Sequence, residues 1–271
     1  MNHITRFSVA PTNIAEIKAN IFSFYKKHKV EFKKNEAFIY EDAYYKVELK
    51  GYKLNQIHKD ILDIILYFGG KEFDGKLKDN NFVRTISLYK IKKHLGYTSS
   101  NNVRWIENKI DEMQQTLIEV TDKQNANNWK FTIIHTAKHS EKLNTYAVII
   151  HPLYFQFFQS NISVDYSYYL KNILNLKNGT TKASIRYLLT HKKGHQININ
   201  NLLQKIGCIN GTQRNLNKQR GKLLKELEEV KEIFNLELIK TTTDNRKNSD
   251  ITIKYTRLPQ IKFYYSEKSE N

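Results

Sequence analysis

The chain has one cysteine among its 271 residues, which excludes an internal disulfide and a zinc site made of several cysteines. It also lacks a long apolar run. The longest, Ile61 to Phe68, is interrupted by Asp63 and is far too short to cross a bilayer. Because the first residues lack the apolar core of a signal peptide, we expect a cytoplasmic protein in which Cys208 is a buried structural thiol.

Motifs for phosphate and metal binding are incomplete. Gly70 to Leu77 approaches a phosphate-binding loop, but Leu77 replaces the Ser or Thr that would bind magnesium, and a helix is predicted before it instead of a strand. We expect a polar turn here. His191 and His195 are spaced like a metal pair on a helix, yet Gly194 lies between them and no third ligand is apparent. The sequence therefore predicts no metal and no other cofactor.

The residues of a nicking enzyme are also missing. Rolling-circle nicking enzymes pair a His-hydrophobic-His metal site with a nucleophilic tyrosine, and no such histidine pair occurs here. Tyr166, Tyr168 and Tyr169 are therefore expected to pack a helix. No arrangement of carboxylates suggests general acid and base catalysis, so we expect a protein that is not an enzyme.

Acidic residues are absent from one long stretch. Lys and Arg total 44 against 27 Asp and Glu, and the net charge of +17 calls for a polyanionic partner or an acidic membrane surface. Between Asp165 and Glu226, sixty residues include twelve Lys or Arg and no acid. Such a stretch can be a solvated basic face. The length of the gap instead favours a surface that contacts DNA phosphates, with Glu226, Glu228 and Glu229 marking where that surface ends.

One order of elements occurs twice, with the copies about 110 residues apart. In the earlier copy, Leu54 to Phe68 predicts a helix, Phe82 to Ile86 a strand, and Ser87 the N-cap of a short helix that Gly96 ends. Next come a helix with Val103, Ile106, Ile110 and Met113 on one face and a strand at Leu117 to Val120. A hairpin wing follows, with strands at Trp129 to His135 and Tyr146 to Ile150 joined by the polar segment Thr136 to Thr145.

The later copy has the same order. A helix begins at Thr181, the strand Gln196 to Ile199 follows, and Asn200 caps a short helix that Gly207 ends. A longer helix then begins near Thr212. Its inward residues are Leu216, Leu223, Leu227 and Val230. The elements after it are a strand at Leu236 to Lys240, a wing loop at Thr241 to Ser249 and a returning strand at Ile251 to Tyr255.

A helix-turn-helix followed by a β-wing, present twice, predicts an α+β fold with two tandem winged-helix domains. We place an N-terminal segment, with short strands packing on the first domain, at residues 1–50. The first winged helix would occupy residues 51–160, the second residues 161–262, and a flexible tail residues 263–271.

The longer helix of the second copy should enter a major groove of DNA. With Leu216 inward, its outward face is expected to combine one base-reading arginine, Arg214, with lysines that contact phosphates. Gly221 lies on the same face, where a missing side chain suggests either close approach of the backbone to DNA or a gap in an amphipathic helix. The expected DNA-binding residues of this domain are Gln213, Arg214, Asn215, Asn217, Lys218, Gly221, Lys222 and Lys225 of the helix and Arg246 and Lys247 of the wing loop.

The corresponding face of the first domain is weaker. Asp111 and Glu112 follow its first turns and would be repelled by phosphates, so only those first turns should approach DNA. Trp105 is expected to pack beneath the wing. This domain would bind DNA less tightly, contact it obliquely, or use part of its surface for another protein. Its expected DNA contacts are Asn101, Arg104 and Asn108.

Short motifs through most of the chain resemble the plasmid replication initiators of the TrfA type, tandem winged-helix proteins that bind repeated origin sites called iterons. No single motif is specific, but their order and spacing are similar to the family pattern. The motifs are Ala19 to Phe22, Gly51 to Gln56 leading into Asp60 to Leu62, His151 to Leu153 with Phe157 and Phe158, Ile162 to Tyr166, and Tyr187 to His191.

This resemblance implies binding of repeated double-stranded DNA, opening of an AT-rich segment and loading of a host helicase, with a host initiator as a further partner. It also implies switching between dimers and monomers, with a homodimer formed through the first domain; no membrane partner is expected. The alternatives are a transcriptional regulator that binds an operator, and a nicking enzyme, against which the missing histidine pair argues.

Overall fold

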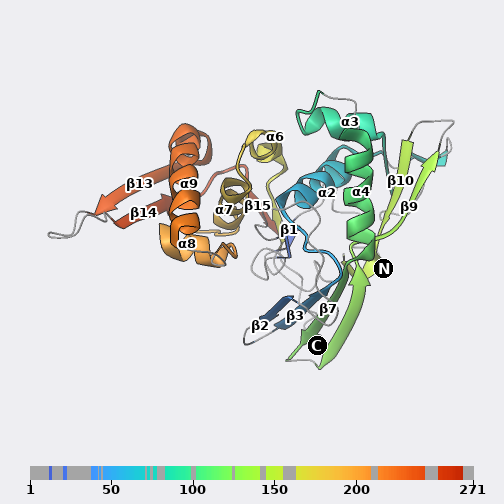
Figure 1. Ribbon diagram of the computed structural model, residues 1–271, viewed down its shortest axis with the longest axis horizontal. Helices are drawn as coiled ribbons and strands as arrows, with labels where there is room; N and C mark the ends of the chain where they lie inside the picture. Colours follow the sequence, from blue (N-terminus) through green and yellow to red (C-terminus); the bar gives the residue numbers. More distant parts are fainter. Residues whose placement is uncertain are drawn as a thin grey trace.

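The structure is a computed structural model that describes residues 12–13, 21–22, 38–41, 43, 45–70, 72–73, 76–77, 83–98, 102–123, 126–140, 145–154, 163–208, 213–241 and 250–264. It is an α+β protein built from two tandem winged helices. The long helices α4 (Asn102–Gln115) and α9 (Gln213–Phe234) stand roughly parallel on opposite sides of α2 (Gln56–Phe68) and α7 (Gly179–Leu189) (Figure 1).

The first winged helix begins with α2, which Asn55 caps by accepting from the Ile57 N–H. Ser87 caps α3 (Leu88–His94) as predicted, and Gly96 follows that helix with a φ of 74°, in the left-handed region that favours glycine. After α4, the wing strands β9 (Ile134–Ser140) and β10 (Thr145–Ile150) pair with β6 (Val83–Ile86) in the order β6-β10-β9.

A second sheet of this half differs from the predicted wing. Its order is β2-β3-β7-β8, formed by β2 (Phe38–Glu41), β3 (Tyr45–Lys50), β7 (Leu117–Asp122) and β8 (Asn127–Thr132). The predicted first wing strand, Trp129 to His135, was wrong because the chain changes sheets at Ile133 and Ile134, both fully buried. The first half of the expected polar connection, Thr136 to Ser140, lies in strand β9, whose mostly exposed, polar side chains give no apolar alternation.

Gly70 to Leu77, expected to be a polar turn, includes a short hairpin of β4 (Glu72–Phe73) and β5 (Lys76–Leu77). Backbone hydrogen bonds join Gly70 to Thr85 of β6.

The second winged helix follows the predicted order closely. It consists of α7, β12 (His195–Asn198), α8 (Ile199–Lys205), α9, and the wing strands β13 (Leu236–Thr241) and β14 (Asp250–Tyr255), in sheet order β12-β14-β13. The predicted cap Asn200 was wrong. Asn198 caps α8, because its extended backbone lets its side chain accept from the Asn200 N–H at 2.8 Å. Gly207, with a φ of 75°, ends the helix as expected.

A small sheet joins distant parts of the chain. Strand β11 (Ser163–Asp165) pairs with β1 (Thr12–Asn13) on one side and with β15 (Lys262–Tyr264) on the other. The predicted tail, residues 263–271, thus begins inside β15, and residues 265–271 lie outside the described part. The 3-10 helix η2 (Ser167–Tyr169) and helix α6 (Leu170–Asn175) lead from this sheet into α7.

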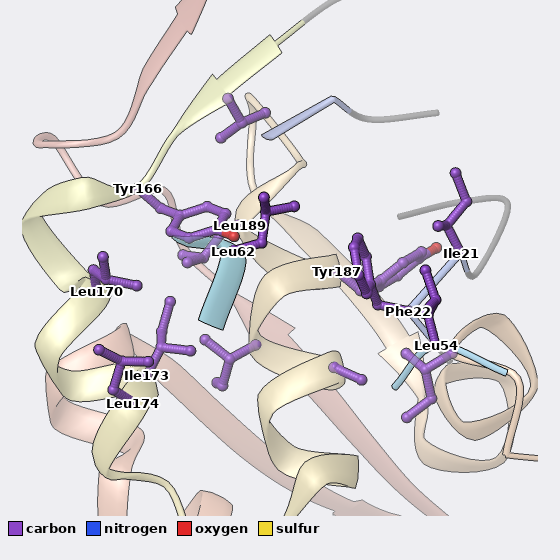
Figure 2. Close-up of a cluster of buried hydrophobic side chains, with 14 of the residues drawn as sticks. Ile21, Phe22, Leu54, Leu62, Tyr166, Leu170, Ile173, Leu174, Tyr187 and Leu189 are labelled. Carbon is purple, nitrogen blue, oxygen red and sulfur yellow. The ribbon is translucent and has the colours of Figure 1, made fainter. Parts of the chain in front are cut away.

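The apolar core continues from one half of the molecule into the other. Leu62 of α2 lies in a buried cluster with residues of α6 and α7 (Figure 2). Tyr166 and Tyr169 are buried there as expected, whereas Tyr168 is 66% exposed and only meets the Tyr169 ring edge to face, 5.0 Å between centroids. The other labelled members of the cluster are Ile21, Phe22, Leu54, Leu170, Ile173, Leu174, Tyr187 and Leu189.

Candidate nucleic-acid interface

The outward face of α9 is polar, basic and exposed. Its inward face is fixed by Leu223 and Leu227, both fully buried, so the side chains about 180° away point to solvent. Every residue of α9 predicted to contact DNA is exposed: Gln213, Arg214, Asn215, Asn217, Lys218, Gly221, Lys222 and Lys225. No other part of the described chain lies within 4 Å of where a Gly221 side chain would begin.

This face carries amide groups beside its cations. Gln213 donates to Asn217 at 3.2 Å, an i,i+4 contact that aligns two amide groups at the start of the helix. A guanidinium and amides near the helix start suit hydrogen bonding to base edges, while the lysines further along suit phosphates. The predicted wing contacts Arg246 and Lys247 lie outside the described residues.

Buried polar contacts hold α9 against α7. Gln219 of α9 accepts a hydrogen bond from Thr180 at 3.2 Å. Glu226 is buried and accepts from the backbone N–H groups of Lys177 and Asn178, at 2.5 and 3.1 Å, and from the Asn178 side chain at 2.7 Å. Of the three acids expected to mark the end of the DNA surface, Glu226 therefore points inward, where its carboxylate satisfies donors that lead into α7, whereas Glu228 and Glu229 are exposed.

In the first winged helix, the exposed part of α4 is short. Arg104 is exposed and Asn108 is half-buried, while Asn101 lies outside the described residues. Trp105 is partly buried and meets the Tyr97 ring edge to face, 5.6 Å between centroids. Trp105 therefore packs against Tyr97, which lies in the turn before α4.

Glu112 was predicted to face outward, but its side chain is buried. It is 5% exposed and accepts from Lys109 at 2.6 Å and from His58 Nε2 at 2.8 Å. Burial alone would raise the pKa of Glu112, but His58 and Lys109 outweigh it and lower the pKa. Burial, followed by the charges of Glu107 and Glu112, raises the pKa of the half-buried Asp111. One of the two expected repulsive charges is thus neutralised inside the domain.

No family model and no curated protein matches the chain. Solved structures that share its fold include the following three. Two contain domains 2 and 3 of RctB: one has a TM-score of 0.61 at 11% identity, covering 92% of this chain and 99% of that one. The other has a TM-score of 0.57 at 10% identity, covering 89% and 96%.

The third similar structure is the Pi initiator protein in complex with iteron DNA, with a TM-score of 0.50 at 14% identity, covering 74% of this chain and 90% of that one. These identities are low, so the likeness concerns the fold. The tandem winged-helix arrangement predicted from the sequence is confirmed.

Two cations of the acid-free stretch do not face solvent. Lys182 and Arg186 of α7 are buried, at 8% and 2% exposure, and contact carboxylates of α2. The sequence prediction had counted them with the DNA-facing charges. The only signal available was their i,i+4 spacing on a helix with apolar neighbours, which does not identify their partners.

The two histidines with metal-like spacing stack on each other. The rings of His191 and His195 lie 3.8 Å apart between centroids, at 13°, and His191 Nδ1 lies 3.1 Å from the Tyr187 carbonyl oxygen. Among the residues that the structure describes, no three His, Cys, Asp or Glu side chains gather as metal ligands. Cys208 is half-buried, and no described helix is long and apolar enough to span a membrane.

Proposed function

We propose that the protein is a replication initiator that binds repeated double-stranded DNA through its two winged helices. The observation that carries this proposal is the exposed face of α9, where Arg214, Lys218, Lys222 and Lys225 point away from the core. Its support comes from the shared fold with the Pi initiator protein, solved in complex with iteron DNA.

In this proposal α9 makes the main contact. Arg214, near the start of the helix, would read a guanine through O6 and N7, and the lysines would neutralise phosphates. Gly221 would let the helix backbone approach the groove closely. Arg104 and Asn108 of α4 would make a smaller contact in a neighbouring groove, and Arg246, Lys247 and Asn101 are kept as candidates from the sequence.

The later steps belong to the same proposal. After binding its repeats, the protein would promote opening of an AT-rich segment and recruit a host helicase, with a host initiator as a further partner and a homodimer formed through the first winged helix. We propose that it does this without cleaving DNA, since no nucleophile with a metal site was found in the sequence.

The test uses supercoiled plasmid carrying the DNA that flanks the gene, where tandem direct repeats of about two helical turns are expected. Purified protein with magnesium should protect these repeats and make an adjacent AT-rich segment reactive to permanganate, while the plasmid stays covalently closed. Nicked circles would overturn the non-enzymatic part. Protection of a single promoter site without strand opening would instead identify a transcriptional regulator.

A matched pair of variants separates specific contact from general charge. Lys218→Gln with Lys222→Gln removes two cations from the proposed surface, and Lys231→Gln with Lys254→Gln removes one half-buried and one exposed cation elsewhere. Only the first pair should weaken binding substantially and lower the slope of log affinity against log salt, by roughly 0.9 for each lost phosphate contact.

A further inference from the structure

A buried network of charged side chains joins the two winged helices, and the proposed DNA contacts do not use it. Arg186 of α7 donates from Nη2 to two carboxylates of α2, Asp60 Oδ1 at 2.7 Å and Asp63 Oδ2 at 2.9 Å. All three residues are at most 6% exposed. Asp60 and Asp63 are three positions apart, so one face of α2 presents both to the same guanidinium.

Lys182 and Tyr166 also contact these carboxylates from the second half of the protein. Lys182, one turn before Arg186, donates to Asp60 Oδ2 at 2.5 Å. The Tyr166 hydroxyl donates to Asp63 at 2.9 Å and accepts from Arg186 Nε at 3.3 Å. Within α2, Lys59 forms an ion pair with Asp63 at 3.0 Å. Each carboxylate is thus held by two cations.

This network restricts orientation in a way that apolar contact does not. The apolar cluster that includes Tyr166 (Figure 2) favours burial, but apolar attraction is non-directional and tolerates small rotations of one helix on the other. A buried guanidinium with two carboxylate partners requires one geometry, because any shift leaves a charge buried without its partner. The contact between α2 and α7 therefore selects a single arrangement of the two halves.

Polar contacts connect this boundary to both long helices. On one side, His58 of α2 bonds to Glu112 of α4 at 2.8 Å. On the other, Asn178 at the start of α7 donates to Glu226 of α9 at 2.7 Å. A series of buried and part-buried contacts thus runs from α4 through α2 and α7 to α9.

We propose that this interdomain ion network fixes the distance and angle between α4 and α9. It thereby makes the protein selective for the spacing between the two DNA segments that it contacts. The network consists of Lys59, Asp60, Asp63, Tyr166, Lys182 and Arg186. The inference rests on the proposed DNA-binding function. One added base pair moves one segment by about 3.4 Å and turns it by roughly a tenth of a turn, a change that a rigid pair of domains cannot follow.

The main test variant, Asp60→Asn with Lys182→Gln, removes one positive and one negative charge while keeping side-chain size. Arg186→Lys is the second variant: it keeps the charge but loses the planar fork, and it carries the test if the pair variant does not fold by circular dichroism. The matched control, Glu237→Gln with Lys254→Gln, neutralises an exposed ion pair between β13 and β14.

Two measurements are made on the wild type, on the test variants and on the control. The first selects binding sites from random duplex DNA and then measures affinity for the selected duplex with one or two base pairs inserted between its two half-sites. The second measures the spin-label distance distribution, without DNA, between Lys130→Cys and Gln204→Cys in a Cys208→Ser background. Both label positions are exposed, one in each half of the protein.

We expect the wild type and the control to lose roughly tenfold in affinity for one inserted base pair, and the pair variant to lose less than about threefold, with a broader distance distribution. Unchanged spacing selectivity and an unchanged distribution in a folded variant would overturn the inference while leaving DNA binding intact. If the wild type selects no repeated sequence, the proposed function itself fails, together with spacing selectivity; the distance distribution still shows whether the network orients the domains.

Discussion

Arg214 and Lys218 lie one helical turn apart on the exposed face of α9, yet they differ in what they can recognise. The planar guanidinium can hold O6 and N7 of one guanine together, whereas the ammonium acts as a point charge. We therefore predict that Arg214→Ala reduces the preference for the selected site over random DNA by about 1–3 kcal/mol. Lys218→Ala should weaken binding to both DNAs equally. Fluorescence anisotropy with both duplexes at several salt concentrations measures this, and equal losses on the two DNAs for Arg214→Ala would refute its assigned role.

Glu226 illustrates a charge whose role is structural. Its buried carboxylate satisfies two backbone N–H groups at the start of α7 and one side-chain amide. We predict that Glu226→Ala lowers the free energy of unfolding by about 2–3 kcal/mol, because these donors would be buried without an acceptor. Glu229→Ala, at an exposed position on the same helix, should change it by less than about 0.5 kcal/mol. Urea denaturation compares them, and similar losses in both would contradict the structural role of Glu226.

At the scale of elements, the packing of α4 on α2 depends on a histidine held neutral. His58 Nδ1 accepts from the Asn55 N–H at 3.0 Å, so Nε2 carries the proton and donates to Glu112. Burial is the main cause that lowers the pKa of His58, and the charge of Lys109 adds to it, against the opposing effect of Glu112. Protonation would remove the acceptor of the Asn55 N–H and place a second proton on a buried ring.

The sign of the pH dependence follows from this lowered pKa. The folded state favours the neutral ring, so the stabilisation is complete above the ordinary pKa of about 6.5 and is lost as pH falls below that value toward the folded-state pKa. We predict that His58→Gln, which keeps a side-chain acceptor at the third position of the helix, loses less stability between pH 7.5 and 5.5 than the wild type. The difference should reach up to about 1.4 kcal/mol per pH unit in urea denaturation.

The variant should retain part of the slope, because burial also lowers the pKa of His94, His151 and His195. Identical slopes for His58→Gln and the wild type would show that His58 does not contribute.

The helices that carry the candidate interface were predictable because their apolar residues repeat at the helical period. That period placed Leu223 and Leu227 inward and so placed Arg214 and Lys218 outward, as the structure has them. Strand β9 was missed because neither of its faces forms a regular apolar row, and its pairing with β10 depends on backbone hydrogen bonds.

Charge partners distant in the sequence were not predictable. Lys182 meets Asp60 across 122 positions, and His58 meets Glu112 across 54. A single sequence contains no signal for such pairs, so charges on these helices were interpreted as solvent-facing or DNA-facing. The error concerns buried charges that connect elements, whereas the exposed charges of α9 were assigned correctly to its surface.

For the whole molecule, the shared core and the interdomain ion network predict that the two winged helices unfold together. The chain contains two tryptophans, Trp105 and Trp129, and both lie in the first half. Their fluorescence therefore reports the unfolding of that half alone. Far-UV circular dichroism also reports the second half, because it contains α9, the longest described helix.

We predict that the two signals give the same urea midpoint in the wild type, because Leu62 packs against α6 and α7 and Arg186 cannot lose its carboxylates without cost. In Asp60→Asn with Lys182→Gln, the weakened boundary should let the halves unfold separately, so that the midpoints differ. The exposed-pair variant Glu237→Gln with Lys254→Gln should keep them equal. Separate midpoints already in the wild type would mean that each winged helix is stable by itself and that the network orients two independent domains without coupling their folding.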